Sequence, residues 1–200
     1  MIHKGIIETL SSTGHNDIMV RTIPVIDFQY FQSSDEIKRQ EFIDKVGESL
    51  KDIGFFALKN HGIPAELIEQ SYAQGDEFFS LDEKTKRSYL QPEISHQRGY
   101  TAFGVEHAKD NPAPDLKEFW QTGRSHQHDD NSKTYPQNVW PDDTVPEFHS
   151  VIDDLYTRME SLSQDLLSAC SIYLGKDSKW LGEMTTDGNT IMRIIHYPPL

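Results

Sequence analysis

Residues 190–199 read Thr-Ile-Met-Arg-Ile-Ile-His-Tyr-Pro-Pro, and Leu200 follows them. Apolar and β-branched side chains, which pack well in sheets, dominate the first eight positions. The two prolines lack the N–H group that a strand needs to continue its hydrogen-bond ladder. The stretch therefore predicts a strand from Thr190 to Tyr197 that stops at Pro198.

The segment before this strand predicts the longest helix of the chain. Apolar residues recur there at three- and four-residue spacing, which places them along one face of a helix. We expect the helix to end at Gly175, because glycine readily adopts the left-handed conformation found just after helices. The predicted stripe comprises Phe148, Ile152, Leu155, Met159, Leu162, Leu166, Ala169, Cys170 and Tyr173.

Residues 23–60 predict a strand, a helix and a second strand. Residues 23–28 alternate like a short strand. A capping box, Ser33-x-x-Glu36, and Gly54 mark the two ends of a helix over residues 33–53. The apolar run at residues 55–60 is nearly continuous, which is typical of a strand buried on both faces.

A turn and two more helices are predicted next. We expect His61 to make a hydrogen bond in the turn and Gly62 to adopt an unusual backbone angle. Pro64 then lies near the first position of a helix, and Ser80-x-x-Glu83 caps a shorter one that runs to about Tyr89. The inner stripe of the first of these helices comprises Leu67, Ile68, Tyr72, Phe78 and Phe79.

Residues 91–146 are rich in proline and glycine, which makes long regular elements improbable there. Short strands are predicted at residues 98–105 and 119–123.

The composition excludes several classes of function. The 200 residues include 32 Asp and Glu against 19 Lys and Arg, a net charge of −13, so binding to a nucleic-acid backbone is not expected. Cys170 is the only cysteine, so no intrachain disulfide can form, and we expect an inert, buried thiol in a reducing compartment. The apolar runs are too short to span a membrane. The sequence therefore predicts a soluble, cytoplasmic protein.

The sequence carries one local cluster of candidate metal ligands, His126-x-His128-x-Asp130. Two imidazoles and a carboxylate are the ligand types of mononuclear non-haem iron sites. No strand pattern holds these three residues in place, so we interpret them as a solvated loop and keep a metal hydrolase that uses them as an alternative. Gly-x-Ser-x-Gly and phosphate-binding glycine motifs are absent from the sequence.

Six phrases occur in order and are found together in one known family. They are Ile23-Pro-Val-Ile-Asp-Phe28, Gly54-Phe-Phe-Ala-Leu-Lys-Asn-His-Gly-Ile63, Phe78-Phe-x-Leu-x-x-Glu-Lys84, Arg98-Gly-Tyr100, Asp115-x-Lys-Glu-Phe119 and Arg193-x-x-His-Tyr-Pro-Pro199. Over residues 23–200 the chain resembles the N-terminal part of the isopenicillin N synthase-like family of non-haem Fe(II)/2-oxoglutarate-dependent dioxygenases.

The resemblance implies an α+β fold in which N-terminal helices buttress part of a double-stranded β-helix, or jelly roll, apparently incomplete at residue 200. We expect residues 1–22 to be a flexible segment and residues 23–200 to be the N-terminal part of the dioxygenase domain. In the family the iron ligands follow the Tyr-Pro-Pro strand, so they are expected beyond Leu200. His128-x-Asp130 precedes the long helix and does not take that role.

Two site residues follow from the resemblance. Tyr197 matches a tyrosine that hydrogen-bonds a carboxylate, of 2-oxoglutarate in many relatives and of the substrate in isopenicillin N synthase. It is the predicted cofactor-binding residue, with packing on the sheet as the alternative. Arg98 lies near an arginine that pairs with a substrate carboxylate, with a surface or structural role as the alternative. Ile195 stands where some relatives have an asparagine that borders the site. Lys117 and Glu118 are expected to form an ion pair that supports the fold.

The implied function is oxidation of a small organic substrate by hydroxylation, desaturation or cyclisation, with Fe(II), O2 and 2-oxoglutarate, which is converted to succinate. Whether 2-oxoglutarate or O2 alone is the oxidant stays open at this point. Residues 1–200 alone are predicted to be inactive, with no catalytic or metal-ligating residue among them. The alternatives are a non-catalytic binding module and a subunit that complements a separate C-terminal half.

Overall fold

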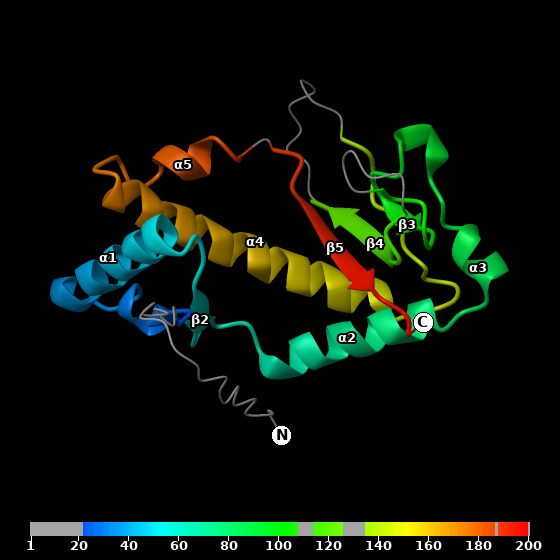
Figure 1. The fold of residues 1–200 in the computed structure, drawn as a ribbon, viewed down its shortest axis with the longest axis horizontal. Coiled ribbons are helices and arrows are strands. Elements are labelled where there is room, and N and C mark those ends of the chain that lie inside the picture. The colour runs from blue at the N-terminus through cyan, green and yellow to red at the C-terminus, as the bar shows by residue number, and fades with distance from the viewer. Residues whose placement is uncertain (1–21, 108–113, 126–134, 187, 200) are drawn as a thin grey trace, which may run out of the picture.

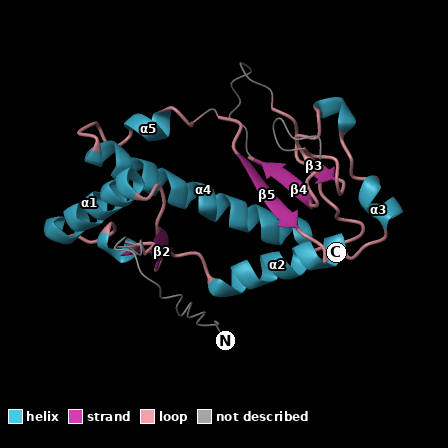
Figure 2. Cartoon of the chain, in the orientation of Figure 1, coloured by secondary structure: helices cyan, strands magenta, loops and turns pink. Residues whose placement is uncertain are grey.

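The structure is a computed structural model that describes residues 22–107, 114–125, 135–186 and 188–199. Helices and strands are mixed along the chain, as expected (Figures 1 and 2). The strands are β1 (Val25–Asp27), β2 (Ala57–Lys59), β3 (Gly99–Thr101), β4 (Glu118–Gly123) and β5 (Ile191–His196). The helices are α1 (Glu36–Asp52), α2 (Ala65–Phe79), α3 (Glu83–Arg87), α4 (Phe148–Tyr173) and α5 (Trp180–Glu183). Short 3-10 helices span Phe28–Tyr30 and Pro92–Ile94.

The N-terminal elements form a small unit at one end of α4. β1 and β2 pair in parallel, with Val25 opposite Ala57 and Asp27 opposite Lys59. Ile26 of β1 and Phe42 of α1 belong to a buried cluster that also includes Ala169 of α4. The C-terminal end of α4 is therefore held against this unit (Figure 1).

The other three strands form an antiparallel sheet at the opposite end of α4, in the order β3-β4-β5 (Figure 2). Trp120 of β4 is fully buried and packs edge-on against Phe78 of α2 and Phe148 of α4, with ring centroids 4.8 and 5.2 Å apart. These contacts fix one face of the sheet against the two helices.

α4 connects the two buried clusters. Its 26 residues span about 39 Å at the rise of an α-helix. Phe148 and Ile152 belong to the sheet cluster, and Ala169 belongs to the N-terminal one. The helix is followed by Gly175, with a φ of +67°, as the sequence predicts. Across the described ranges, the helices lack the combination of length and apolarity that crossing a bilayer requires.

The helix caps differ from the predicted ones. Asp35, not Ser33, caps α1, since its Oδ1 accepts a hydrogen bond from the Ile37 amide at 3.0 Å. Asp82, not Ser80, caps α3 by accepting from the Thr85 amide at 3.0 Å. A carboxylate also carries the charge that the N-terminus of a helix favours, so aspartate competes well with the nearby serines. Pro64 directly precedes Ala65, the first residue of α2, and so lies near the first position as predicted.

Two predictions of burial were wrong. The strand at residues 55–60 is shorter and only partly covered, because Phe55 is 55% exposed and both Ala57 and Lys59 are exposed. Tyr72 and Met159, assigned to inner stripes, are 72% and 47% exposed. Tyr72 and Met159 lie in one region together with Leu58 of β2, and part of the expected core is uncovered there.

Candidate functional site

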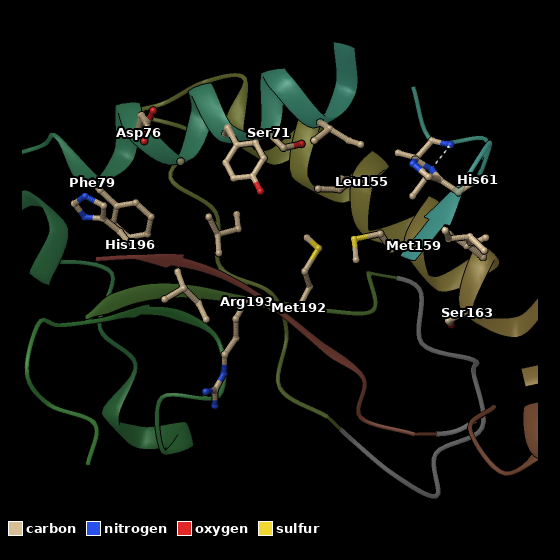
Figure 3. Close-up of a pocket in the computed structure, with 18 of the residues that line it drawn as sticks. His61, Ser71, Asp76, Phe79, Leu155, Met159, Ser163, Met192, Arg193 and His196 are labelled. Atoms are coloured by element: carbon tan, nitrogen blue, oxygen red, sulfur yellow. Dashed lines mark hydrogen bonds between the residues drawn. The ribbon is translucent and has the colours of Figure 1, made fainter. Parts of the chain in front are cut away.

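A groove of about 700 Å³ lies between α2, α4 and β5 and is here called the α2–α4–β5 groove (Figure 3). Leu58 of β2 and the turn after it close one end. Its lining comprises Leu58, His61, Ile63, Ile68, Ser71, Tyr72, Gly75, Asp76, Phe79, Leu155, Met159, Leu162, Ser163, Leu166, Met192, Arg193, Ile194, Ile195 and His196. Most of these side chains are apolar, so the groove is suited to receive apolar surface.

The apolar stripe of α4 explains why the groove exists. Leu155, Met159, Leu162 and Leu166 follow the predicted helical spacing and line the groove, and Leu162 and Leu166 also pack against the N-terminal cluster. A solvent-facing apolar surface of this kind marks an interaction or binding site.

The two faces of β5 have different roles, because successive strand residues point to opposite sides. Met192 and Ile194 pack against the sheet cluster on the groove side. The side chain of Arg193 points away from the groove in Figure 3. Ile195, and Tyr197 just beyond the strand, continue the alternation on the face of Arg193, and they are 46% and 66% exposed.

Arg193 is held in place on this outer face. Its Nε donates to Gln121 Oε1 at 2.9 Å and its Nη1 donates to Glu106 Oε1 at 3.2 Å. The guanidinium also lies 4.7 Å above the centroid of the Phe119 ring. Glu106 in turn pairs with Lys117 at 2.7 Å, and these two cations lower the pKa of the Glu106 carboxyl against the effect of burial.

Lys117 and Glu118 do not form the predicted ion pair. Adjacent strand residues face opposite sides, so Lys117 pairs with Glu106 and with Asp115, while Glu118 points to the groove side. The side chain of Glu118 is only 4% exposed, and its partners are Lys86 at 2.7 Å and His196 Nδ1 at 2.8 Å.

Glu118 therefore joins three elements to β4. Besides Lys86 of α3 and His196 of β5, the Tyr100 hydroxyl of β3 donates to its Oε2. Burial raises the pKa of the Glu118 carboxyl, but the hydrogen bonds from Lys86, Tyr100 and His196 outweigh burial and hold it below its ordinary value. Burial and the bond to Glu118 raise the pKa of the Tyr100 hydroxyl. The ammonium of Lys86 and the hydroxyl of Tyr100 both donate to Glu118, so its surroundings favour the ionised carboxylate as an acceptor.

Arg98 and Tyr197, the two predicted site residues, lie at opposite ends of β5. Arg98 is 1% exposed, donates to Gln97 O and Asn189 Oδ1 at 2.8 Å each, and packs over Gly123, the partner of Ile191. Six strand residues, about 20 Å, separate that point from Tyr197. The structure does not bring the two side chains to one small ligand. Their binding roles stay predictions.

Three polar residues of this region were not recognised as site residues from the sequence: Arg193, His196 and the carboxylate Glu118. The sequence indicates part of this arrangement, because alternation along the strand at residues 190–197 places Arg193 and Tyr197 on one face and His196 on the other. The pairing of Glu118 with His196 depends on strand register, which the sequence does not reveal.

The described residues do not fit an iron site. Among residues 22–107, 114–125, 135–186 and 188–199, no three His, Cys, Asp or Glu side chains come together as metal ligands. His126, His128 and Asp130 lie outside the described residues, so the structure does not test the alternative built on them.

The fold is shared with solved structures of 2OG-Fe(II) oxygenase type. A 2OG-Fe(II) oxygenase family protein from Caulobacter crescentus has a TM-score of 0.76 and 30% sequence identity, covering 89% of this chain and 57% of that chain. A full-length Neurospora crassa protein, solved in complex with alpha-KG, has a TM-score of 0.73 and 28% identity, covering 88% of this chain and 54% of that chain. The class of the fold is therefore that of 2OG-Fe(II) oxygenases.

A family model described as "non-haem dioxygenase in morphine synthesis N-terminal" matches residues 23–143, more than half of the chain. The chain belongs to this family of non-haem Fe(II)/2-oxoglutarate dioxygenases, which confirms the resemblance seen in the sequence. The 2-oxoglutarate-dependent dioxygenase thnC of Trichoderma harzianum is 29% identical over 180 residues, which cover 88% of this chain and 56% of the relative. The chain spans about half the length of the curated relatives it matches.

Proposed function

We propose that this chain is the N-terminal half of an Fe(II)- and 2-oxoglutarate-dependent oxygenase that oxidises a small organic substrate. Family membership supports the chemistry, since similar proteins carry names such as "2-oxoglutarate-Fe(II) type oxidoreductase". Their additional length supports the division into halves. Fe(II) and the residues that bind it would belong to the other half, because the described residues do not fit the metal.

The observation that carries this proposal is a pair of unpaired strand edges at the α2–α4–β5 groove. Within the described residues, β2 pairs only with β1, and β5 pairs only with β4. Leu58 of β2 and residues 192–196 of β5 both line the groove. Exposed strand edges readily accept further strands, and apolar side chains beneath them would be covered by those strands.

Strands of the C-terminal half would therefore lie over α2 and α4 and extend the sheet from β5 toward β2. One larger sheet of this kind is what the proposed jelly roll requires. Covering the groove would bury the α4 stripe that the sequence predicts as core, including the exposed Met159. The proposal thus explains the exposure of Tyr72 and Met159, which both line the groove.

Residue roles follow from the two faces of β5. The outer face, which carries Arg193 and Tyr197, would line the interior of the roll, where the substrate and 2-oxoglutarate bind. The phenol of Tyr197 would donate one directed hydrogen bond to a carboxylate. A substrate-binding role for Arg98 would require a ligand at the Asn189 end, because that guanidinium is already bound there. The cytoplasmic location is part of the proposal and rests on the single cysteine.

Covalent completion of the chain tests the proposal. Residues 1–200 would be fused to the C-terminal part of the Caulobacter crescentus oxygenase, the part that this chain does not cover. We expect succinate release from 2-oxoglutarate by the fusion and none by residues 1–200 or the C-terminal part alone.

The alternative of a non-catalytic binding module would be favoured by two results together. Residues 1–200 would be monomeric and unfold cooperatively, and the fusion would fold but stay inactive. Aggregation of residues 1–200 alone would agree with unpaired strand edges. Succinate release by residues 1–200 alone would contradict the proposal.

A further inference from the structure

Two histidines line the α2–α4–β5 groove, one near each end (Figure 3). His61 lies in the turn after β2, and His196 is the last residue of β5. In a neutral imidazole one nitrogen donates a hydrogen bond and the other accepts one, and the bond made by the first nitrogen decides the role of the second.

The hydrogen bond that His61 accepts favours a neutral ring with its proton on Nε2. Its Nδ1 accepts a hydrogen bond from the Ile63 amide at 3.2 Å, so a neutral His61 cannot carry a proton on Nδ1. The tight turn that makes this bond needs positive φ angles at Asn60 and Gly62, 56° and 80°. His61 therefore has an Nε2–H group as its remaining donor.

The ring of His196 has the opposite arrangement. Its Nδ1 lies 2.8 Å from Oε1 of Glu118, which is an ionised carboxylate and can only accept. Lys86 and Tyr100 donate to the other oxygen of Glu118, so the carboxylate is fixed in place. The imidazole also stacks on Phe79, with ring centroids 5.1 Å apart and planes at 20°. Nε2 of His196 is then left as an acceptor.

We propose that His61 and His196 determine the register of the segment that fills the groove, by offering a donor at the β2 end and an acceptor at the β5 end. The occupant is the C-terminal half of the oxygenase, so the inference rests on the proposed function. The matching segment presents a hydrogen-bond acceptor near His61 and a donor near His196. A shifted register leaves both imidazoles unmatched in apolar surroundings, which disfavours it.

Nitrogen-15 NMR of the imidazole rings tests the first part on residues 1–200 without any enzymatic assay. At about pH 8.5, above the ordinary pKa of an imidazole, we expect Nε2–H for His61 and Nδ1–H for His196. The two residues serve as controls for each other. Glu118→Gln should shift His196 toward Nε2–H and leave His61 unchanged. The same protonated nitrogen in both rings of the wild-type chain overturns the inference, whether or not the variant folds.

Association with the separately produced C-terminal part of the Caulobacter crescentus oxygenase tests the second part. His61→Phe and His196→Phe should each weaken binding by about tenfold, the loss of one matched polar contact. His196→Asn, whose amide can donate toward Glu118 but whose shorter side chain places no acceptor at the position of Nε2, should weaken binding as much as His196→Phe. Ser150→Ala is the control, since that hydroxyl donates to Glu147 O at 3.1 Å at the start of α4 and does not line the groove.

The two proposals can fail separately. Unchanged binding by all three histidine variants overturns the register role while succinate release by the fusion still supports the proposed function. A fusion that folds but stays inactive counts against the proposed function, whereas the imidazole protons in residues 1–200 are measured independently of it.

Discussion

Removing the cation from the buried Lys86–Glu118 pair is expected to be among the most damaging substitutions in the sheet. The two side chains are 10% and 4% exposed, and their charged atoms are 2.7 Å apart. Lys86→Met keeps most of the side-chain length and apolar stem but leaves the Glu118 carboxylate buried without its counter-charge. Tyr100 and His196 remain as hydrogen-bond donors but do not replace a fixed positive charge.

The expected loss is about 3–5 kcal/mol of unfolding free energy, the usual cost of breaking one side of a buried ion pair. Arg158→Met is the matched control, because the Arg158–Asp154 pair has a similar distance, 2.8 Å, but its side chains are 44% and 46% exposed. That control should cost no more than about 0.5 kcal/mol. Both variants remove one charge of an ion pair, so the difference between their losses of unfolding free energy reports the effect of burial.

Urea unfolding followed by tryptophan fluorescence measures both losses, and Trp120 in the sheet core provides a local signal. The double variant Lys86→Met, Glu118→Met should recover much of the loss, since no unpaired charge then remains. A loss below about 1 kcal/mol for Lys86→Met, close to that of the control, would refute the assignment of Glu118 as a buried anion.

Three further substitutions have expected outcomes that the same contacts define. The folded-state pKa of Glu118 is below its ordinary 4.5, so the ionised form of this carboxyl stabilises the fold above that pH. The wild type should therefore have a higher unfolding free energy than Glu118→Gln at neutral pH, and this difference should shrink as the pH falls below 4.5. A constant difference between pH 7 and pH 3 contradicts this. Gly47→Ala should lower the unfolding free energy by about 1–3 kcal/mol, because a Cβ there would overlap ring carbons of Tyr173. A gain in stability in urea unfolding would contradict the close contact between Gly47 and Tyr173. Met159→Lys should change the unfolding free energy of residues 1–200 by no more than about 0.5 kcal/mol, since that side chain is 47% exposed. The same substitution should weaken binding of the C-terminal part at least tenfold in calorimetry. Equal binding would argue against the groove as the contact surface.

The elements of the fold could largely be predicted from local sequence patterns. The helical stripe from Phe148 to Tyr173 and the strand before Pro198 are confirmed almost to the residue, because periodicity and proline act within a few neighbouring positions. Burial was harder to predict. Met159 follows the correct spacing and still faces a groove, because the sequence pattern reports which side of a helix is apolar and not what covers it.

The candidate site could be predicted only in part. The family resemblance drew attention to Tyr197 and Arg98, but their separation along β5 depends on the pairing of Gly123 with Ile191. Glu118 and Lys117 are neighbours in sequence and were expected to pair, yet the strand turns them to opposite faces. Contacts between distant segments, such as Lys86 with Glu118, require the register of the sheet.

Amide hydrogen exchange along β5 tests most directly whether the groove and its open strand edge receive the rest of the domain. Within the described residues, β5 pairs with β4 alone, and alternate N–H groups of an edge strand point away from its partner. Half of the β5 amides in residues 1–200 should therefore exchange rapidly, and half should be protected by β4. In the fusion with the C-terminal part of the Caulobacter crescentus oxygenase, we expect the rapid set at residues 191–196 to slow at least tenfold. A folded, active fusion in which those amides still exchange as fast as in residues 1–200 alone would contradict the account.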